Sequence, residues 1–167
     1  MCCPGGDSGG GALFGEVVDR IPERVRRAVY VDSGPLTDGA ALPPDLPPDT
    51  VELPLPSWAA LEASGTSAEG LDDDARAMFR ARAVPHPAGV ASEPVHVSDA
   101  RRLAVPVTAI CSSLPSEVLR NLAHAGPPLN TEHGELDVTY VDVPTGHWPM
   151  LSRPADLAAA IIEAAHA

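Results

Sequence analysis

The chain has 167 residues, enough for one domain with a substantial buried core. Its formal net charge is −12 at pH 7, with only 11 Lys and Arg residues, which excludes a nucleic-acid-binding surface. No apolar run approaches the roughly 20 residues of a membrane span, and the start of the chain lacks the pattern of a secretory signal. Three cysteines without a repeated spacing describe neither a disulfide framework nor a zinc site. We therefore expect a cytoplasmic protein with no membrane contact.

The first third of the chain predicts a helix and then a buried strand. Gly10 to Ile21 carries apolar residues at helical spacing and ends at Pro22. Val25–Val31 ends in a continuous apolar run, which is typical of a parallel strand buried on both faces. The residues Met1–Gly5 are too few to form a strand ahead of the helix. We therefore expect Val25–Val31 to be an exposed sheet edge through which the isolated chain self-associates.

The middle of the chain is rich in proline and acidic residues. Residues 32–56 predict a loop, and Trp58–Ala63 predicts a short helical turn. A clearer helix is predicted over Ala68–Ala83, with three aspartates in its first turns, where they favour the helix dipole. It is broken by the segment Val84–Pro87.

The last third alternates strands with helices. Val95–Val97 predicts a short extended segment, and Val105–Cys111 and Leu136–Val143 predict the second and third strands. Helices are expected from Ser116 to Ala123 and from Pro154 to Ala165. Strands that alternate with helices indicate an α/β protein in which the three strands lie side by side and parallel.

The first chemical signal is the run Gly6-Asp7-Ser8-Gly9-Gly10, which fits the pattern G-x-S-x-G. A nucleophilic serine on a sharp strand-to-helix turn needs small neighbours, because the backbone is strained there and the adjoining elements pack closely. The amide of the following residue, Gly9, then points toward the oxyanion that it stabilises.

The second signal is His147, which follows an apolar strand and precedes the closing helix. The carboxyl ends of parallel strands meet at one edge of a sheet, where ligands bind. We therefore expect Ser8 and His147 at that edge, with the nucleophile first in the chain and the histidine last.

These residues resemble the second half of an α/β-hydrolase-fold protein. The resemblance is carried by Gly6–Gly11, Ile21–Val25, Ala28–Asp32, Thr145–Met150 and Arg153-Pro154. It implies a partial α/β-hydrolase fold, with about three parallel strands flanked by helices, a proline-rich cap insertion and the front half of the sheet absent. It also implies that Ser8 is the nucleophile and His147 the general base. We expect three regions: 1–38 with the elbow, 39–94 as the cap, and 95–167 as the rest of the core.

The acid of the triad has two candidates. Asp32 directly follows the first strand, where some α/β-hydrolases place their acid, and Glu117 lies beyond the second strand, near the more common position. We favour Asp32, because a carboxylate at the carboxyl end of a strand can meet the histidine directly. Glu117 also fits an ordinary first-turn acid of a helix.

The expected activity is serine hydrolysis of a small-molecule ester or similar carbonyl substrate, with no cofactor and no metal. The alternative is a truncated, catalytically impaired remnant or a binding module, because the acidic Asp7 adjoins the nucleophile and the loop that supplies a second oxyanion donor is not seen. The expected substrate-pocket residues are Trp58, Met78, Phe79, His86 and Trp148.

Overall fold

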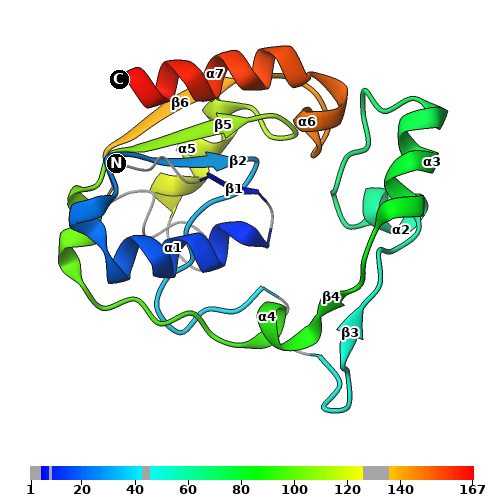
Figure 1. Cartoon of the computed structure of the whole chain (residues 1–167), viewed down its shortest axis with the longest axis horizontal. Coiled ribbons are helices and arrows are strands. Elements are labelled where there is room, and N and C mark those ends of the chain that lie inside the picture. The colour runs from blue at the N-terminus through cyan, green and yellow to red at the C-terminus, as the bar shows by residue number, and fades with distance from the viewer. Residues whose placement is uncertain (1–4, 8, 43–45, 126–135) are drawn as a thin grey trace.

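The chain folds as a parallel sheet with helices on both faces (Figure 1). The computed structural model describes residues 5–7, 9–42, 46–125 and 136–167. The four strands of the sheet lie in the order β1 (Gly5–Asp7), β2 (Ala28–Val31), β5 (Val107–Cys111) and β6 (Val138–Asp142). All neighbouring pairs are parallel. The predicted α/β class and the side-by-side arrangement of the three apolar strands are confirmed.

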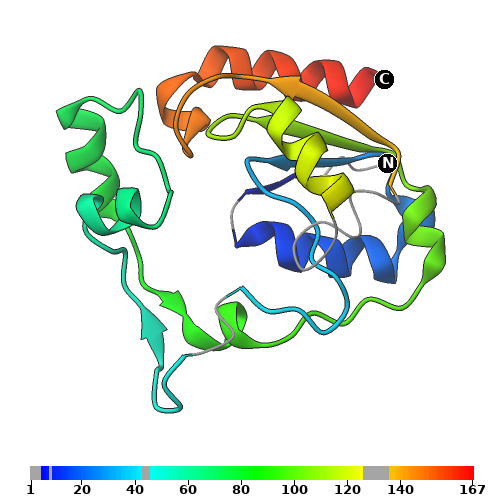
Figure 2. The same ribbon diagram turned by 180° about the vertical axis from the view of Figure 1, so that it is seen from behind.

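The two central strands are buried on both faces because their side chains alternate between two apolar layers. Ala28 and Tyr30 of β2 pack toward helix α1 (Gly10–Arg20), whereas Val29 and Val31 pack toward helix α7 (Pro154–His166). Helix α5 (Ser116–Ala125) lies beside β6, and the short helix α6 (Pro149–Ser152) precedes α7. Figures 1 and 2 show α1 and α7 on opposite faces of the sheet. Short 3₁₀ helices at Pro22–Arg24 and Ala100–Ala104 lead into β2 and β5.

The first strand corrects the expected sheet edge. Gly5, Gly6 and Asp7 pair in parallel with Val29, Tyr30 and Val31, so β2 is covered by a neighbour and is an interior strand. The prediction that Val25–Val31 is an edge was wrong, because a strand of three residues needs only backbone hydrogen bonds, which glycine supplies as well as any residue. Self-association stays a prediction, but this edge no longer supports it.

The segment of residues 39–94 lies beside the sheet, near the end at which α6 begins (Figure 1). It contains the antiparallel pair β3 (Glu52–Leu53) and β4 (His86–Pro87) and the helices α2 (Trp58–Ala63), α3 (Asp73–Arg82) and α4 (Ala88–Ser92). The helix predicted at Trp58–Ala63 is confirmed. The longer helix begins at Asp73, later than predicted, because Asp72 caps it by accepting a hydrogen bond from the amide of Ala75 at 2.8 Å.

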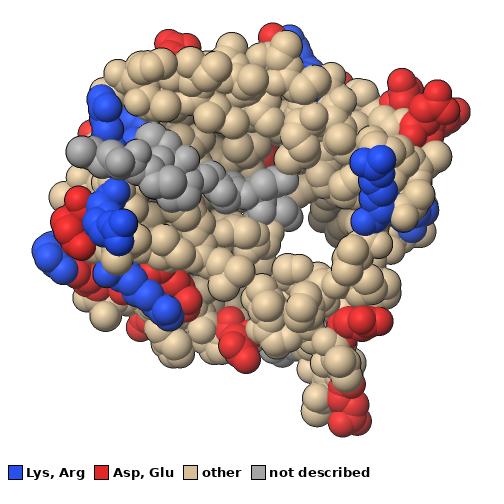
Figure 3. All heavy atoms as spheres, viewed as in Figure 1, with Lys and Arg blue, Asp and Glu red and all other residues tan. Residues whose placement is uncertain are grey.

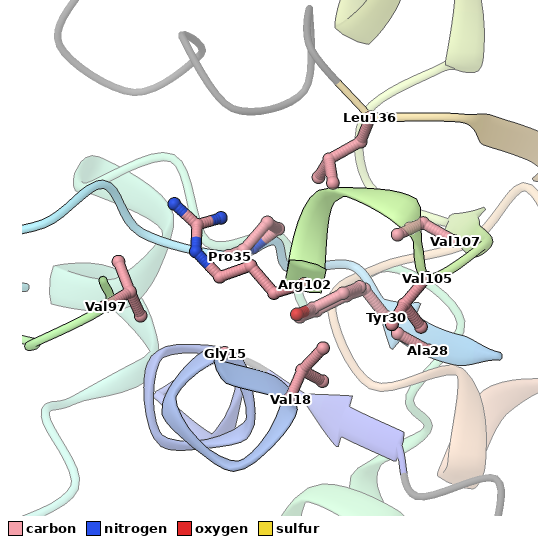
Figure 4. Close-up of a pocket in the computed structure, with 10 residues that line it drawn as sticks. All are labelled: Gly15, Val18, Ala28, Tyr30, Pro35, Val97, Arg102, Val105, Val107 and Leu136. Atoms are coloured by element: carbon pink, nitrogen blue, oxygen red, sulfur yellow. The ribbon is translucent and has the colours of Figure 1, made fainter. Parts of the chain in front are cut away.

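Three further findings concern the segment Val95–Val97, a small cavity and the helices. The extended segment predicted at Val95–Val97 forms no strand. A cavity of about 20 Å³ beside Tyr30 and Val18, shown in Figure 4, holds about one water molecule and no substrate. In the described part of the chain, no helix has both the length and the apolar character needed to cross a membrane.

Candidate functional site

The carboxyl ends of β2 and β6 bring together an acid and a histidine. Asp32 directly follows β2, and His147 lies in the loop after β6. Nδ1 of His147 and Oδ2 of Asp32 are 2.6 Å apart. The Asp32 side chain is 5% exposed and that of His147 is 15% exposed, so water competes little for this hydrogen bond. Residues 115 positions apart in the chain therefore form a pair of the kind that fixes an imidazole tautomer.

The backbone of Asp32 is strained. Its φ is +45°, and among the described residues it is the one non-glycine residue with a positive φ. Such a conformation costs on the order of 1–3 kcal/mol and persists where the surrounding structure over-determines it. Its amide is fixed by a 2.9 Å hydrogen bond to the carbonyl of Ile110 on the neighbouring strand. The turn holds the carboxylate at the carboxyl end of β2. Backbone strain of this kind is typical of functional sites.

The Asp32 carboxylate accepts three more hydrogen bonds from the end of β5. Oδ1 accepts the amides of Ser112 at 3.1 Å and Ser113 at 2.8 Å, and Oδ2 accepts the hydroxyl of Ser113 at 2.5 Å. Burial acts to raise the pKa of Asp32, but the hydrogen bonds from His147, Ser113 and Ser112 outweigh burial and hold this pKa well below its usual range. The carboxylate is therefore charged at neutral pH.

The loop that carries His147 is fastened to the 39–94 segment. The amide of His147 donates to the carbonyl of Ser67 at 2.8 Å, and the amide of Gly146 donates to the carbonyl of Glu69 at 3.1 Å. A Cβ at position 146 would lie 2.6 Å from Ser67 O and from Glu69 N, so only glycine fits this closely against the backbone of residues 67–69. The position of the histidine thus depends on a segment about eighty residues away in sequence.

Four of the predicted pocket residues have other surroundings. Trp58, Phe79 and Trp148 pack against one another, with ring centroids 5.2–5.9 Å apart, and Leu61 and Leu71 complete this cluster. Met78 is 39% exposed on α3. The cluster joins the 39–94 segment to the His147 loop, and Trp148 also meets the ring of His147 edge-on at 5.3 Å. These aromatic rings thereby pack as a small core beside the histidine.

A cavity of about 400 Å³ adjoins the Asp32–His147 pair. Its apolar wall comes from the loop after β2 and from the end of β5 with α5, and it consists of Pro35, Leu36, Ile110, Cys111, Leu114, Leu119 and Leu122. Residues 64–66 of the 39–94 segment close another side. Burial raises the pKa of Cys111 to about 12, with smaller contributions from Asp142 and Asp32, so its thiol stays neutral. Figure 3 shows the molecular surface open between the 39–94 segment and the rest of the molecule.

The predicted nucleophile, Ser8, lies outside the described residues. Its described neighbours are β1, which ends at Asp7, and α1, which begins at Gly10, so the sequence position falls between a strand and a helix. Gly11 lets the first turn of α1 approach the loop after Asp32, since a Cβ there would lie 2.9 Å from the carbonyl of Gly34. His86 of β4 is exposed, and its Nε2 lies 3.8 Å from the Cβ position of Gly9. His86 is therefore a neighbour of Gly9, which belongs to the motif.

Glu117, the other candidate acid, is exposed in the first turn of α5. Asp32 occupies the hydrogen-bonding position at Nδ1 of His147.

Sequence reasoning missed Ser113 and the contact between Gly146 and the 39–94 segment. The one available signal for Ser113 was its place directly after a strand of the parallel sheet. Within the described residues, no group of three or more His, Cys, Asp or Glu side chains could hold a metal ion.

A parallel sheet with a histidine–carboxylate pair at the carboxyl ends of its strands is consistent with part of an α/β-hydrolase fold, and comparison with solved structures shows this fold. The chain is similar to a pyrethroid hydrolase from Sphingobium faniae, with 21% identity and a TM-score of 0.59 over 98% of this chain and 70% of that one. It is similar to tomato methylketone synthase I, with 17% identity and a TM-score of 0.64 over 96% and 68%. It is also similar to an extracellular α/β-hydrolase from a Paenibacillus species, with 17% identity and a TM-score of 0.67 over 96% and 70%.

At these identities the likeness establishes the fold alone. No family model matches the sequence. No curated protein matches it significantly.

Proposed function

We propose that this chain is a serine hydrolase that cleaves an ester or a similar carbonyl substrate, with Ser8 as nucleophile, His147 as general base and Asp32 as the acid. The observation that carries the proposal is the 2.6 Å hydrogen bond between Nδ1 of His147 and Oδ2 of Asp32. It makes Nδ1 the nitrogen that meets the acid. In a serine triad the acid meets this nitrogen of the histidine, and the other nitrogen serves the nucleophile.

The proposed reaction has two balanced steps. In the first step, His147 Nε2 takes the proton of the Ser8 hydroxyl while Oγ of Ser8 attacks the carbonyl carbon of the substrate. The carbonyl oxygen becomes an oxyanion, to which the Gly9 amide donates a hydrogen bond. Collapse breaks the bond to the leaving alcohol, which receives the proton from His147 and leaves an acyl-serine. In the second step, a water molecule attacks the acyl-serine and gives its proton to His147. The acid product then departs, and Ser8 regains its proton from His147. The charged Asp32 stabilises the imidazolium in both steps.

The cavity beside the pair supports an uncharged substrate. Apart from Asp32 and His147, the described residues that line it carry no charge, and leucine side chains form much of its wall. An apolar group gains free energy on entering such a site, whereas a charged group would lose its hydration without a partner. Pyrethroid hydrolase and the α/β-hydrolase from Paenibacillus, both similar in fold, are consistent with a hydrolytic activity.

The test combines an active-site probe with matched variants. A fluorophosphonate should label the chain, and Ser8→Ala should abolish the labelling. Asp32→Asn should lower the esterase rate by about 10⁴, as loss of the tautomer-fixing carboxylate does in serine proteases. Glu117→Gln, at the exposed competing position, should change the rate little. Labelling that survives in Ser8→Ala would remove Ser8 from the mechanism, and an unlabelled native chain would favour a binding module.

A further inference from the structure

The hydroxyl of Ser113 shares one oxygen of Asp32 with the histidine. Oδ2 accepts from Ser113 Oγ at 2.5 Å and faces His147 Nδ1 at 2.6 Å. Oδ1 is held separately by the backbone amides of Ser112 and Ser113. The backbone donors would survive a change of side chain at position 113, whereas the bond to Oδ2 would not.

Without the Ser113 hydroxyl, Oδ1 keeps its two backbone amides, whereas Oδ2 keeps only its hydrogen bond with His147. The terminal torsion of aspartate is broad, so the side chain has no strong preference of its own for one orientation. A short hydrogen bond from a hydroxyl to a charged carboxylate is roughly twice as strong as one between neutral groups. The Ser113 hydroxyl therefore fixes the oxygen that the histidine uses.

We propose that Ser113 is a positioning residue that orients the Asp32 carboxylate toward Nδ1 of His147, and so sets the imidazole for catalysis. This inference rests on the proposed function and extends it to a residue that does not touch the substrate-facing nitrogen. It also assigns a role to the end of β5, since the acid follows β2 and the serine from the neighbouring strand completes its support.

The chain contains a matched control for this hydrogen bond. Ser116 donates its amide and its hydroxyl to Asp142, at 2.8 and 2.7 Å, in the same arrangement that Ser113 makes with Asp32. These hydrogen bonds lower the pKa of Asp142. Ser116→Ala therefore removes a comparable hydroxyl–carboxylate bond without touching Asp32 or His147.

The experiment compares Ser113→Ala, Ser113→Thr and Ser116→Ala in the full chain. Ser113→Ala should lower kcat about tenfold with little change in KM, because one hydrogen bond to a charged group is lost. Ser113→Thr should restore kcat, since it keeps a hydroxyl and position 113 is exposed enough for a methyl group. Ser116→Ala should leave kcat unchanged.

A second readout does not require turnover. The Nδ1 proton of His147, hydrogen-bonded to Asp32, should give a downfield proton resonance that Ser113→Ala broadens through faster exchange with water. The resonance should persist in Ser116→Ala and return in Ser113→Thr. An unchanged resonance in Ser113→Ala would overturn the positioning role. An inactive native chain would overturn the proposed function instead, and the resonance alone would then decide the role of Ser113.

Discussion

Gly146→Ala should damage both stability and catalysis, because the backbone at position 146 lies directly against the backbone of residues 67–69. The added Cβ would lie 2.6 Å from Ser67 O, 2.6 Å from Glu69 N and 2.7 Å from Glu69 O, whereas ordinary contact begins at 3.4 Å. The two segments must therefore move apart by about 0.8 Å. That displacement strains the hydrogen bonds from Gly146 to Glu69 and from His147 to Ser67.

The expected magnitudes follow from these contacts. Overpacking of this kind costs about 1–3 kcal/mol, and the two weakened hydrogen bonds together add roughly 1 kcal/mol, so the free energy of unfolding should fall by about 2–4 kcal/mol. For a chain of this length, the Tm should fall by roughly 5–15 °C. A catalytic group displaced by close to 1 Å can cost about 10²-fold in rate, and kcat/KM should fall accordingly.

The assay is a thermal melt followed by circular dichroism, together with ester hydrolysis below the Tm of the variant. Gly15→Ala is the matched control, because a Cβ there meets Pro35 at an ordinary 3.7 Å within helix α1. This control should match the native chain or gain up to about 1 kcal/mol from helix propensity. If Gly146→Ala melts and turns over like Gly15→Ala, the 39–94 segment does not fix the His147 loop and the reasoning is refuted.

Two further predictions concern Asp32 and the cavity. The folded-state pKa of Asp32 is depressed, so its contribution to stability is present above its unfolded pKa near 3.9 and is lost as pH falls below that value. In Asp32→Asn, the free energy of unfolding, measured by urea titration, should therefore fall less steeply below pH 4 than in the native chain. An equally steep fall in the variant would contradict this. Leu122→Asp should raise KM about tenfold for long-chain esters, but little for acetate esters. Equal changes in KM for the two kinds of ester would argue against Leu122 as a contact of the acyl chain. Leu122 is 41% exposed, so the variant should keep the fold, which circular dichroism checks.

The sequence by itself determined the class of the fold and the proximity of Asp32 to His147. Apolar runs bounded by breakers identify β2 and β5 as buried strands, because a strand covered on both faces needs apolar residues on both. Asp32 follows β2 and His147 lies in the loop after β6, and parallel strands have their carboxyl ends at the same side of a sheet, so their proximity could be expected before any distance was measured.

Only the tertiary structure decided how those residues are held. β1 has no apolar pattern, since its pairing uses backbone groups that every sequence carries. The hydroxyl of Ser113 meets Asp32 across 81 positions of sequence, and the fit of Gly146 against Ser67 and Glu69 depends on how two distant segments pack. Local patterns record periodicity and turn chemistry, whereas contacts of this kind depend on register between neighbouring strands and on close approach between segments.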